Sequence, residues 1–345
     1  MAKRDILSMT LPELSAQVEV LGQPGYRSRQ IFGFLHNKLA GSFDEMTNLP
    51  KSFRAQLDDS FVILGCAIEK KLVSCYDNTV KYLFRLNDGE YIECVVMRYK
   101  YGLSVCVSTQ VGCAMGCKFC ATGIGGFVRD LKPAEMLSQV YAAQRDLGER
   151  ISHIVLMGMG EPLLNYDNVL RFLELVSDPL GLNIGMRNIS VSTCGIVDRI
   201  YDLAELDLQI TLSVSLHAPS DEIRSALMPV NNKWGVDELL KACVYYEQKT
   251  GRRISFEYSM INGVNDGPEA ARLLGKKLSG TLCHVNLIPV NEVKETGMRA
   301  GSRRNIESFK SILESYGLTV TVRRTLGSDI NASCGQLRRK ARGES

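Results

Sequence analysis

Three cysteines lie close together in the segment Cys113-Ala-Met-Gly-Cys117-Lys-Phe-Cys120. Thiolates at this spacing, in one short loop, can converge on a site for a soft metal. A structural zinc would need a fourth ligand, and no other Cys or His lies near enough in the sequence to supply it. A [4Fe–4S] cluster that only transfers electrons would also use four cysteines. Three ligands leave one iron open, which is the arrangement expected of an enzyme that binds a substrate at its cluster.

The remaining cysteines divide into two groups. The chain has 11 cysteines, an odd number, and its start lacks an apolar secretory segment, so we expect reduced thiols rather than a disulfide framework. Cys106 lies on the predicted strand before the three-cysteine loop, and Cys334 lies near the C-terminus. The others occur singly in apolar or strand-like surroundings, which predicts buried core thiols. These are Cys66, Cys75, Cys94, Cys194, Cys243 and Cys283.

Strand-like and helix-like segments alternate from about residue 103 onward, and these elements must position the cysteines. Such alternation predicts parallel strands joined by right-handed crossovers. Six or seven strand–helix units are fewer than the eight of a complete barrel, so the predicted fold class is α/β with a partial (β/α)6 barrel. The predicted strands are 103–110, 152–160, 187–195, 208–217, 253–261, 284–291 and 318–325.

Two shorter regions precede this barrel. Residues 1–60 have the pattern of short amphipathic helices, which predicts a small helical accessory domain. Residues 61–100 contain β-rich segments separated by turn-forming residues, which predicts a short antiparallel β extension. Residues 101–345 then form the barrel core, together with the C-terminal loop that carries Cys334.

Small and polar residues gather where four predicted barrel strands end. Parallel α/β folds place their chemistry at these strand ends. Any one of these groups could simply form a turn, but four equivalent positions indicate a binding rim. The rim residues are Gly160 with Glu161, Ser192, the run Ser215-Leu216-His217, and Asn291.

The three-cysteine loop after the first strand of a partial barrel resembles the radical S-adenosylmethionine (SAM) superfamily. The flanking motifs are similar to those of the RlmN/Cfr family of rRNA adenine methyltransferases, from about residue 10 to about residue 340. The helical region 1–60 resembles that family's RNA-binding accessory domain. The matching motifs are VCVSTQVGCAMGCKFCATG, VLMGMGEPLLN, ISVSTCGI, SVSLHAP, SFEYSMINGVND, HVNLIPVN and DINASCGQLR.

The resemblance implies a role for each matching residue. Cys113, Cys117 and Cys120 match the three ligands of a single [4Fe–4S] cluster, whose open iron holds the amino and carboxylate groups of SAM. The SAM contacts match Gly160, Glu161, Ser192, Ser215, Leu216, His217 and Asn291. Cys334 matches the cysteine that carries the methyl group, Cys106 the resolving cysteine, and Glu93 the proton acceptor.

The resemblance also implies a ping-pong reaction that consumes two SAM molecules. Carbon 2 of adenine is electron-poor and has no lone pair, so it cannot attack a SAM methyl group directly, whereas a radical can add to it. In the family, the cysteine matching Cys334 takes a methyl group from one SAM. A 5′-deoxyadenosyl radical from the second SAM then activates this methyl group for addition to adenine. Release of the product leaves a transient Cys106–Cys334 disulfide, which must be reduced.

RNA and a reductant are the implied partners. A formal charge of +3 does not by itself indicate nucleic acid binding. Basic residues nevertheless flank the predicted catalytic loop and occupy the N-terminal helices, which favours phosphate contacts. These residues are Arg27, Arg29, Lys38, Arg323, Arg324, Arg338, Arg339, Lys340 and Arg342. The family implies adenosine 2503 of 23S rRNA as substrate, and its carbon-2 branch, which this chain resembles more, includes enzymes that also modify adenosine 37 of tRNA.

Several alternatives stay open at this point. The family also contains carbon-8 methyltransferases that confer antibiotic resistance. A non-enzymatic RNA-binding protein with a structural metal would need neither Cys106 nor Cys334. Methylthiolation of RNA is disfavoured because it normally uses a second cluster, and the sequence has no second group of cysteines. We expect a cytoplasmic monomer that takes electrons from a flavodoxin or ferredoxin, since no stretch of about 18 apolar residues predicts a membrane span.

Overall fold

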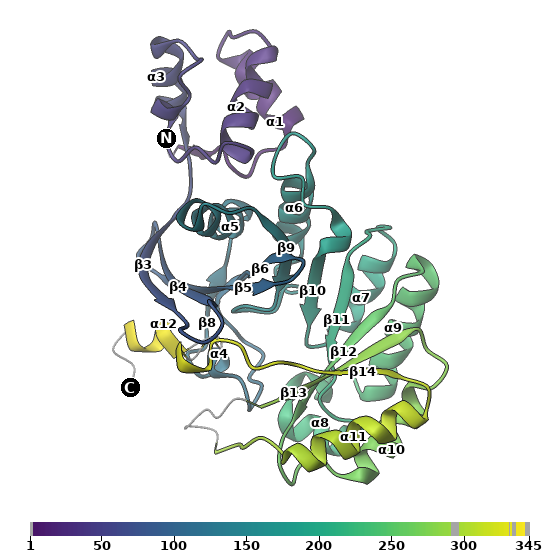
Figure 1. Cartoon of the computed structure of the whole chain (residues 1–345). Helices are drawn as coiled ribbons and strands as arrows, with labels where there is room; N and C mark the ends of the chain where they lie inside the picture. Colours follow the sequence, from purple (N-terminus) through teal and green to yellow (C-terminus); the bar gives the residue numbers. More distant parts are fainter. Residues whose placement is uncertain (1–2, 291–296, 331, 333–335, 342–345) are drawn as a thin grey trace.

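Seven parallel strands form one side of a ten-stranded sheet, and they confirm the predicted α/β class (Figure 1). The computed structural model describes residues 3–290, 297–330, 332 and 336–341 of the chain. Neighbouring strands follow the chain order from β6 and β9 through to β14, as a partial barrel requires. The parallel strands are β6 (Gly102–Cys106), β9 (Ile151–Leu156), β10 (Ile189–Thr193), β11 (Thr211–Ser215), β12 (Ile254–Met260), β13 (Cys283–Pro289) and β14 (Thr319–Val322).

Three antiparallel strands continue the same sheet beyond β6. They are β3 (Cys66–Val73), β4 (Val80–Leu86) and β5 (Tyr91–Tyr99). Their order is β6-β5-β4-β3, so the β-rich segments predicted between residues 61 and 100 widen the barrel wall. Both faces of β4 are covered: Tyr82 and Phe84 belong to the main core, while Lys81 and Leu83 lie on the opposite face.

Helices connect the parallel strands and follow the curve of the sheet (Figure 1). Strand β10 shows why they pack there: Ile189 and Val191 are buried in the core, whereas Ser190 and Ser192 point to the other face, toward the barrel lumen. The connecting helices are α5 (Pro133–Leu147), α6 (Tyr166–Ser177), α7 (Val197–Ala204), α8 (Asp221–Leu227), α9 (Val236–Thr250), α10 (Pro268–Leu278) and α11 (Arg303–Ser315), with the 3-10 turns η2 (Met186–Asn188) and η3 (Pro229–Asn232).

The first sixty residues form the short helices predicted for them. A capping box begins the first helix, because the Glu13 carboxylate accepts from the Thr10 backbone N–H and the Thr10 hydroxyl accepts from the Glu13 N–H. His36 connects this region to the barrel through a buried hydrogen bond between its Nδ1 and the Tyr141 hydroxyl, at 2.8 Å. The elements are β1 (Arg4–Asp5), α1 (Leu11–Val20), α2 (Tyr26–His36), η1 (Phe43–Glu45), α3 (Lys51–Ser60) and β2 (Phe61–Val62), with β1 paired to β2 in parallel.

The C-terminal helix α12 (Gln336–Ala341) returns to the antiparallel strands, where it contacts β5. Figure 1 shows it beside α4 (Ala121–Ile124) and β8 (Phe127–Asp130), far from β14. The segment between β14 and α12, with the short turn η4 (Ser328–Ile330), therefore crosses the open side of the barrel. In the described ranges, no helix has the length and apolar composition that crossing a bilayer requires.

Candidate active site

The three-cysteine loop is closed at its base by a short β-hairpin. Strand β7 (Gln110–Gly112) precedes the loop and pairs antiparallel with β8 after it. The N–H of Cys113 donates to the Gly126 carbonyl at 2.9 Å, which continues the hairpin into the loop. Gly112 has a φ of 80°, and a Cβ there would lie 1.9 Å from the Gly126 oxygen, so only glycine fits this close crossing.

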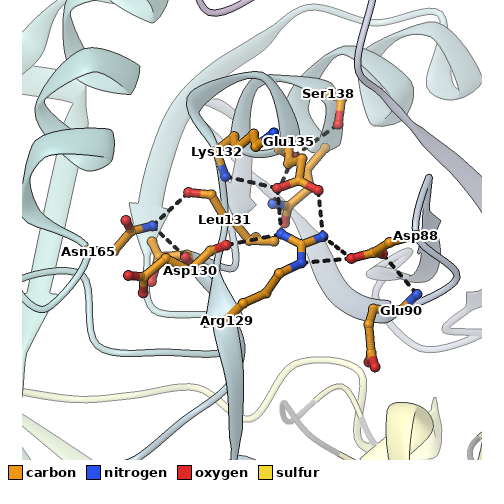
Figure 2. Close-up of polar contacts among 11 residues, drawn as sticks. Asp88, Glu90, Arg129, Asp130, Leu131, Lys132, Glu135, Ser138 and Asn165 are labelled. Atoms are coloured by element: carbon orange, nitrogen blue, oxygen red, sulfur yellow. Dashed lines mark hydrogen bonds and ion pairs between the residues drawn. The ribbon is translucent and has the colours of Figure 1, made fainter. Parts of the chain in front are cut away.

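A partly buried polar network anchors this hairpin to the rest of the barrel. Figure 2 shows the Arg129 guanidinium between Glu135 and Asp88, with two hydrogen bonds to Glu135 at 2.7 and 2.8 Å and one to Asp88 at 2.7 Å. Glu135 also caps α5 by accepting from the Lys132 N–H. Asn165 donates to the carbonyls of Thr109 and Leu131, both at 2.8 Å, and so bridges the two sides of the hairpin. The loop therefore rests on a rigid base.

The three cysteines line one cavity of about 350 Å³ in the barrel lumen. Burial raises the pKa of the Cys113 thiol to about 11, and burial likewise raises the pKa of Cys117. Among the described residues, no three Cys, His, Asp or Glu side chains are placed to bind a single metal ion. A four-iron cubane instead takes one thiolate per iron and needs no such convergence, so three soft sulfur donors around one cavity fit a [4Fe–4S] cluster.

The glycine–glutamate motif after β9 forms one wall of the same cavity. A Cβ on Gly158 would lie 2.7 Å from the backbone of Val107, just after β6, and a Cβ on Gly160 would lie 2.6 Å from Gln110, the first residue of β7. The two glycines therefore allow the chain to approach the segment from the end of β6 to the start of β7 closely. Glu161 is buried, which raises the pKa of its carboxyl group. Its carboxylate accepts from the backbone N–H groups of Cys194 at 2.7 Å and Leu163 at 3.1 Å.

The ends of β10 and β11 supply further predicted residues. Ser192, Ser215 and His217 line the cavity, whereas Leu216 is fully buried and is not among the lining residues. Burial lowers the pKa of His217 to about 3, so its ring is neutral. Its Nδ1 accepts from the Ser259 N–H at 2.9 Å, which leaves the proton on Nε2. His217 also has a φ of 57°, so its backbone turns sharply at the cavity edge.

Glu93 lies on β5 beside a buried cation, and it is fully buried rather than among the described residues that line the cavity. Its carboxylate is 2.9 Å from the Lys81 ammonium, and neither side chain is exposed to solvent. The other carboxylate oxygen accepts from the backbone N–H of Arg338 in α12, at 2.8 Å. Glu93 therefore connects the antiparallel strands to the C-terminal segment.

Cys106 ends β6 and also lines the cavity. It packs in a small apolar cluster with Val95 and Met97, against which Leu326 and Ala332 of the C-terminal segment lie. The structure thus brings the chain two residues before position 334 to the surroundings of Cys106. Two predicted site residues, Asn291 and Cys334, lie outside the described residues.

Two predictions from the sequence were wrong. Cys75 is exposed rather than buried, because it lies in the turn before β4 and donates to the Asp329 carboxylate. Arg338 is only 2% exposed and pairs with Glu90 at 3.3 Å, so its guanidinium is not available for RNA phosphates. The prediction of buried core thiols is confirmed for Cys94, Cys194, Cys243 and Cys283, and Cys66 is partly buried. The ten cysteines that the structure describes are free thiols.

Sequence reasoning missed three polar residues at the site. Cys194 lines the cavity beside Glu161, and Glu257 lines it from β12. Burial raises the pKa of Glu257, which accepts from Ser255 and Asn286. The third residue is Lys81, the ion-pair partner of Glu93. The sequence pattern did not indicate it, because it lies among apolar residues of β4. The alternation of Ser255 and Glu257 on β12 was the one sequence signal that could have indicated that Glu257 faces the lumen.

A larger cavity, about 570 Å³, lies between α9 and α10 and contains none of the predicted site residues.

Comparisons with known proteins agree with this geometry. Residues 107–274 match the radical SAM superfamily, and residues 4–63 match the ribosomal RNA large subunit methyltransferase N-terminal domain. The chain is 53% identical over 336 residues to a "Probable dual-specificity RNA methyltransferase RlmN" of Clostridium perfringens, covering 97% of each chain. A relative of the same name from Lachnoclostridium phytofermentans is 52% identical, covering 98% of this chain and 95% of the relative. A crystal structure of a radical SAM methyltransferase from Sphaerobacter thermophilus superposes with a TM-score of 0.93 at 43% identity, covering 96% and 98% of the two chains.

Proposed function

Because this chain belongs to the RlmN family of radical SAM RNA methyltransferases, we propose that it methylates carbon 2 of adenosine 2503 in 23S rRNA. The words "dual-specificity" in the relatives' name support a second RNA substrate, for which we propose adenosine 37 of tRNA. The observation that carries the proposal is the single cavity shared by three loop cysteines, Glu161 and Cys106.

Cys113, Cys117 and Cys120 would hold the cluster, and the rim after β9, β10 and β11 would hold SAM. When bound, the cluster and SAM supply one-electron chemistry that can activate a methyl group for addition to an electron-poor ring carbon. The Gly158–Glu161 wall is rigid, because Gly158 lies against the Val107–Ser108 backbone, Gly160 lies against Gln110, and Glu161 is held by two N–H donors. This rigidity suits a site that must orient SAM relative to a fixed metal centre.

Cys334 and Cys106 would act at different steps of the methyl transfer. The Cys334 thiolate would take a methyl group supplied by SAM. The one-electron chemistry that the bound cluster and a second SAM supply would remove one hydrogen atom from this methyl carbon. The carbon would then add to carbon 2 of adenine while it stays bonded to sulfur, and one electron of the adduct would return to the cluster. Glu93 removes the proton from carbon 2, since its carboxylate is held in place by Lys81 and the Arg338 N–H. Attack of Cys106 on the Cys334 sulfur forms a disulfide, breaks the sulfur–carbon bond and releases methyladenosine after the carbon gains a proton. The packing of Ala332 against the Cys106 cluster supports this pairing.

The test is anaerobic incubation of the iron-loaded protein with SAM, a reductant such as flavodoxin or ferredoxin, and unmodified 23S rRNA or tRNA. Mass spectrometry of the nucleosides should then detect 2-methyladenosine. Formation of 8-methyladenosine would instead place the chain with the carbon-8 enzymes. Absence of any methylated adenosine from cluster-loaded protein would overturn the proposal.

Matched cysteine variants test whether Cys334 carries the methyl group. Cys334→Ala should abolish methyl transfer while iron content and the absorbance of the cluster remain unchanged. Cys75→Ala is the control, because this thiol is exposed and lies outside the cavity. It should retain activity near that of the unmodified protein. Normal turnover by Cys334→Ala would exclude the ping-pong mechanism.

A further inference from the structure

Arg224 on α8 is the largest side chain that is fully buried in the described part of the chain. Its guanidinium donates to three backbone carbonyls, those of Cys194 at 2.7 Å, Leu216 at 3.1 Å and Ser215 at 3.2 Å. These carbonyls belong to the ends of β10 and β11, which form the rim of the cavity. Arg224 therefore lies directly beneath the proposed site.

Every acceptor that the Arg224 guanidinium contacts is neutral. The fourth is the Asn231 side-chain oxygen, at 3.0 Å. No carboxylate of the described residues lies within salt-bridge distance of Arg224. Asp221, on the same helix, interacts with Arg224 electrostatically and is joined to it through the side-chain amide of Asn231. A guanidinium keeps its proton in proteins. The chain therefore buries a positive charge whose hydrogen bonds all go to neutral acceptors, with no carboxylate in contact, and burying a charge in this way is unfavourable unless another charge compensates it.

The cysteine loop lies on the same helix. The N–H of Lys118, between two of the loop cysteines, donates to the Leu227 carbonyl at the end of α8, at 2.9 Å. The neighbouring Phe119 ring meets the His217 ring edge-on, with centroids 4.7 Å apart. Electrostatic interactions link Arg224 to Cys194, Cys117 and Cys243 as well as to Asp221, and Cys117 directly precedes Lys118 in the loop. The buried charge is thus close to one of the sulfurs that would hold the cluster.

We propose that Arg224 is the buried counter-charge of the iron–sulfur cluster and makes the cluster easier to reduce. Three thiolates give the oxidised cluster a net negative charge, and reduction adds one more electron. A fixed positive charge beside it stabilises the reduced form more than the oxidised form, because net charge and burial set the potential of such clusters. The same hydrogen bonds hold the rim carbonyls in place. This inference rests on the proposed function only in requiring a cluster at the three cysteines.

The test is a redox titration, followed by electron paramagnetic resonance, of the full chain loaded with iron and sulfide without oxygen. Arg224→Met should load the same iron but lower the equilibrium constant for reduction on the order of tenfold, a shift of about 59 mV to more negative potential for one electron. Arg224→Lys loses some of the hydrogen bonds to the three carbonyls but keeps the positive charge. Because the charge is kept, the potential of this variant should stay close to that of the unmodified protein. Arg199→Met is the control, because Arg199 is exposed and paired with Asp202, and its potential should not change.

The outcomes distinguish an effect of the Arg224 charge from an effect of its hydrogen bonds to the rim carbonyls. An unchanged potential in Arg224→Met, or a lysine variant shifted as far as the methionine variant, would overturn the proposal. If Arg224→Met takes up no iron, the lysine variant decides: a potential near that of the unmodified protein supports the counter-charge, and a lowered one refutes it. Failure of the unmodified chain to form methyladenosine would refute the proposed function while leaving the potentials interpretable. Normal methylation with no potential shift would refute only the role of Arg224.

Discussion

Replacing Lys81 should reveal the most costly buried ion pair of the described structure. Lys81 and Glu93 are both completely buried, and their charged atoms are 2.9 Å apart. Removing one partner of such a pair leaves a charge in a low-dielectric interior and typically costs about 3–5 kcal/mol. The Arg338 N–H still bonds to Glu93, so we expect Lys81→Met to lower the free energy of unfolding by about 3 kcal/mol, at the lower end of that range.

Urea denaturation of the cluster-free protein, followed by circular dichroism, measures this cost. The double variant Lys81→Met with Glu93→Gln removes both charges, so it should recover most of the lost stability. Lys249→Met is the matched control, since the Lys249–Glu205 pair is about half exposed on both sides and such pairs contribute only about 0.2–1 kcal/mol. A cost for Lys81→Met no larger than that of the control would refute the reasoning. So would a double variant as unstable as the sum of the single variants.

Three further predictions concern the site and its supports. Gly158→Ala should greatly weaken SAM binding measured by calorimetry, because its Cβ would lie 2.7 Å from the Val107 backbone. Gly185→Ala is the control: its Cβ meets no atom within 4 Å, so this variant should bind SAM normally. Asn165→Ala removes two buried hydrogen bonds: the Leu131 carbonyl loses this donor, while the Thr109 carbonyl keeps the Leu131 N–H at 3.0 Å. The variant should therefore destabilise the protein by about 1–3 kcal/mol and reduce iron retention on dialysis, and retention equal to that of the unmodified protein would refute its anchoring role. Burial lowers the pKa of His36 from 6.5 to about 3, so the unfolded state binds the proton first and stability falls as pH drops below 6.5 toward 3. His36→Gln should reduce the slope of unfolding free energy against pH in that window by about 1.4 kcal/mol per unit, and an unchanged slope would show that His36 does not titrate on unfolding.

The partial barrel was predictable because its signals are local. Alternating residues such as those of β10 identify a strand with one face toward the helices and one toward the lumen. The spacing of Cys113, Cys117 and Cys120 identifies a metal-binding loop without reference to distant residues. The rim residues follow from the position of each strand's end. Periodicity and spacing therefore predicted the fold class, the cysteine loop and the rim at the strand ends, whereas the roles of Glu93, Cys106 and Cys334 were predicted only from the family resemblance.

Only the tertiary structure decided which charged residues are buried, and with which partners. Arg224 lies in a short helix that also carries exposed acidic residues, and Lys81 lies in a strand whose two faces are both covered. Their burial depends on contacts with strand ends and with β5, which sequence periodicity does not encode. The contact between Glu93 and the Arg338 N–H spans 245 residues of sequence. The free energy of a buried charge is set by the partners around it, and long-range folding alone brings those partners together.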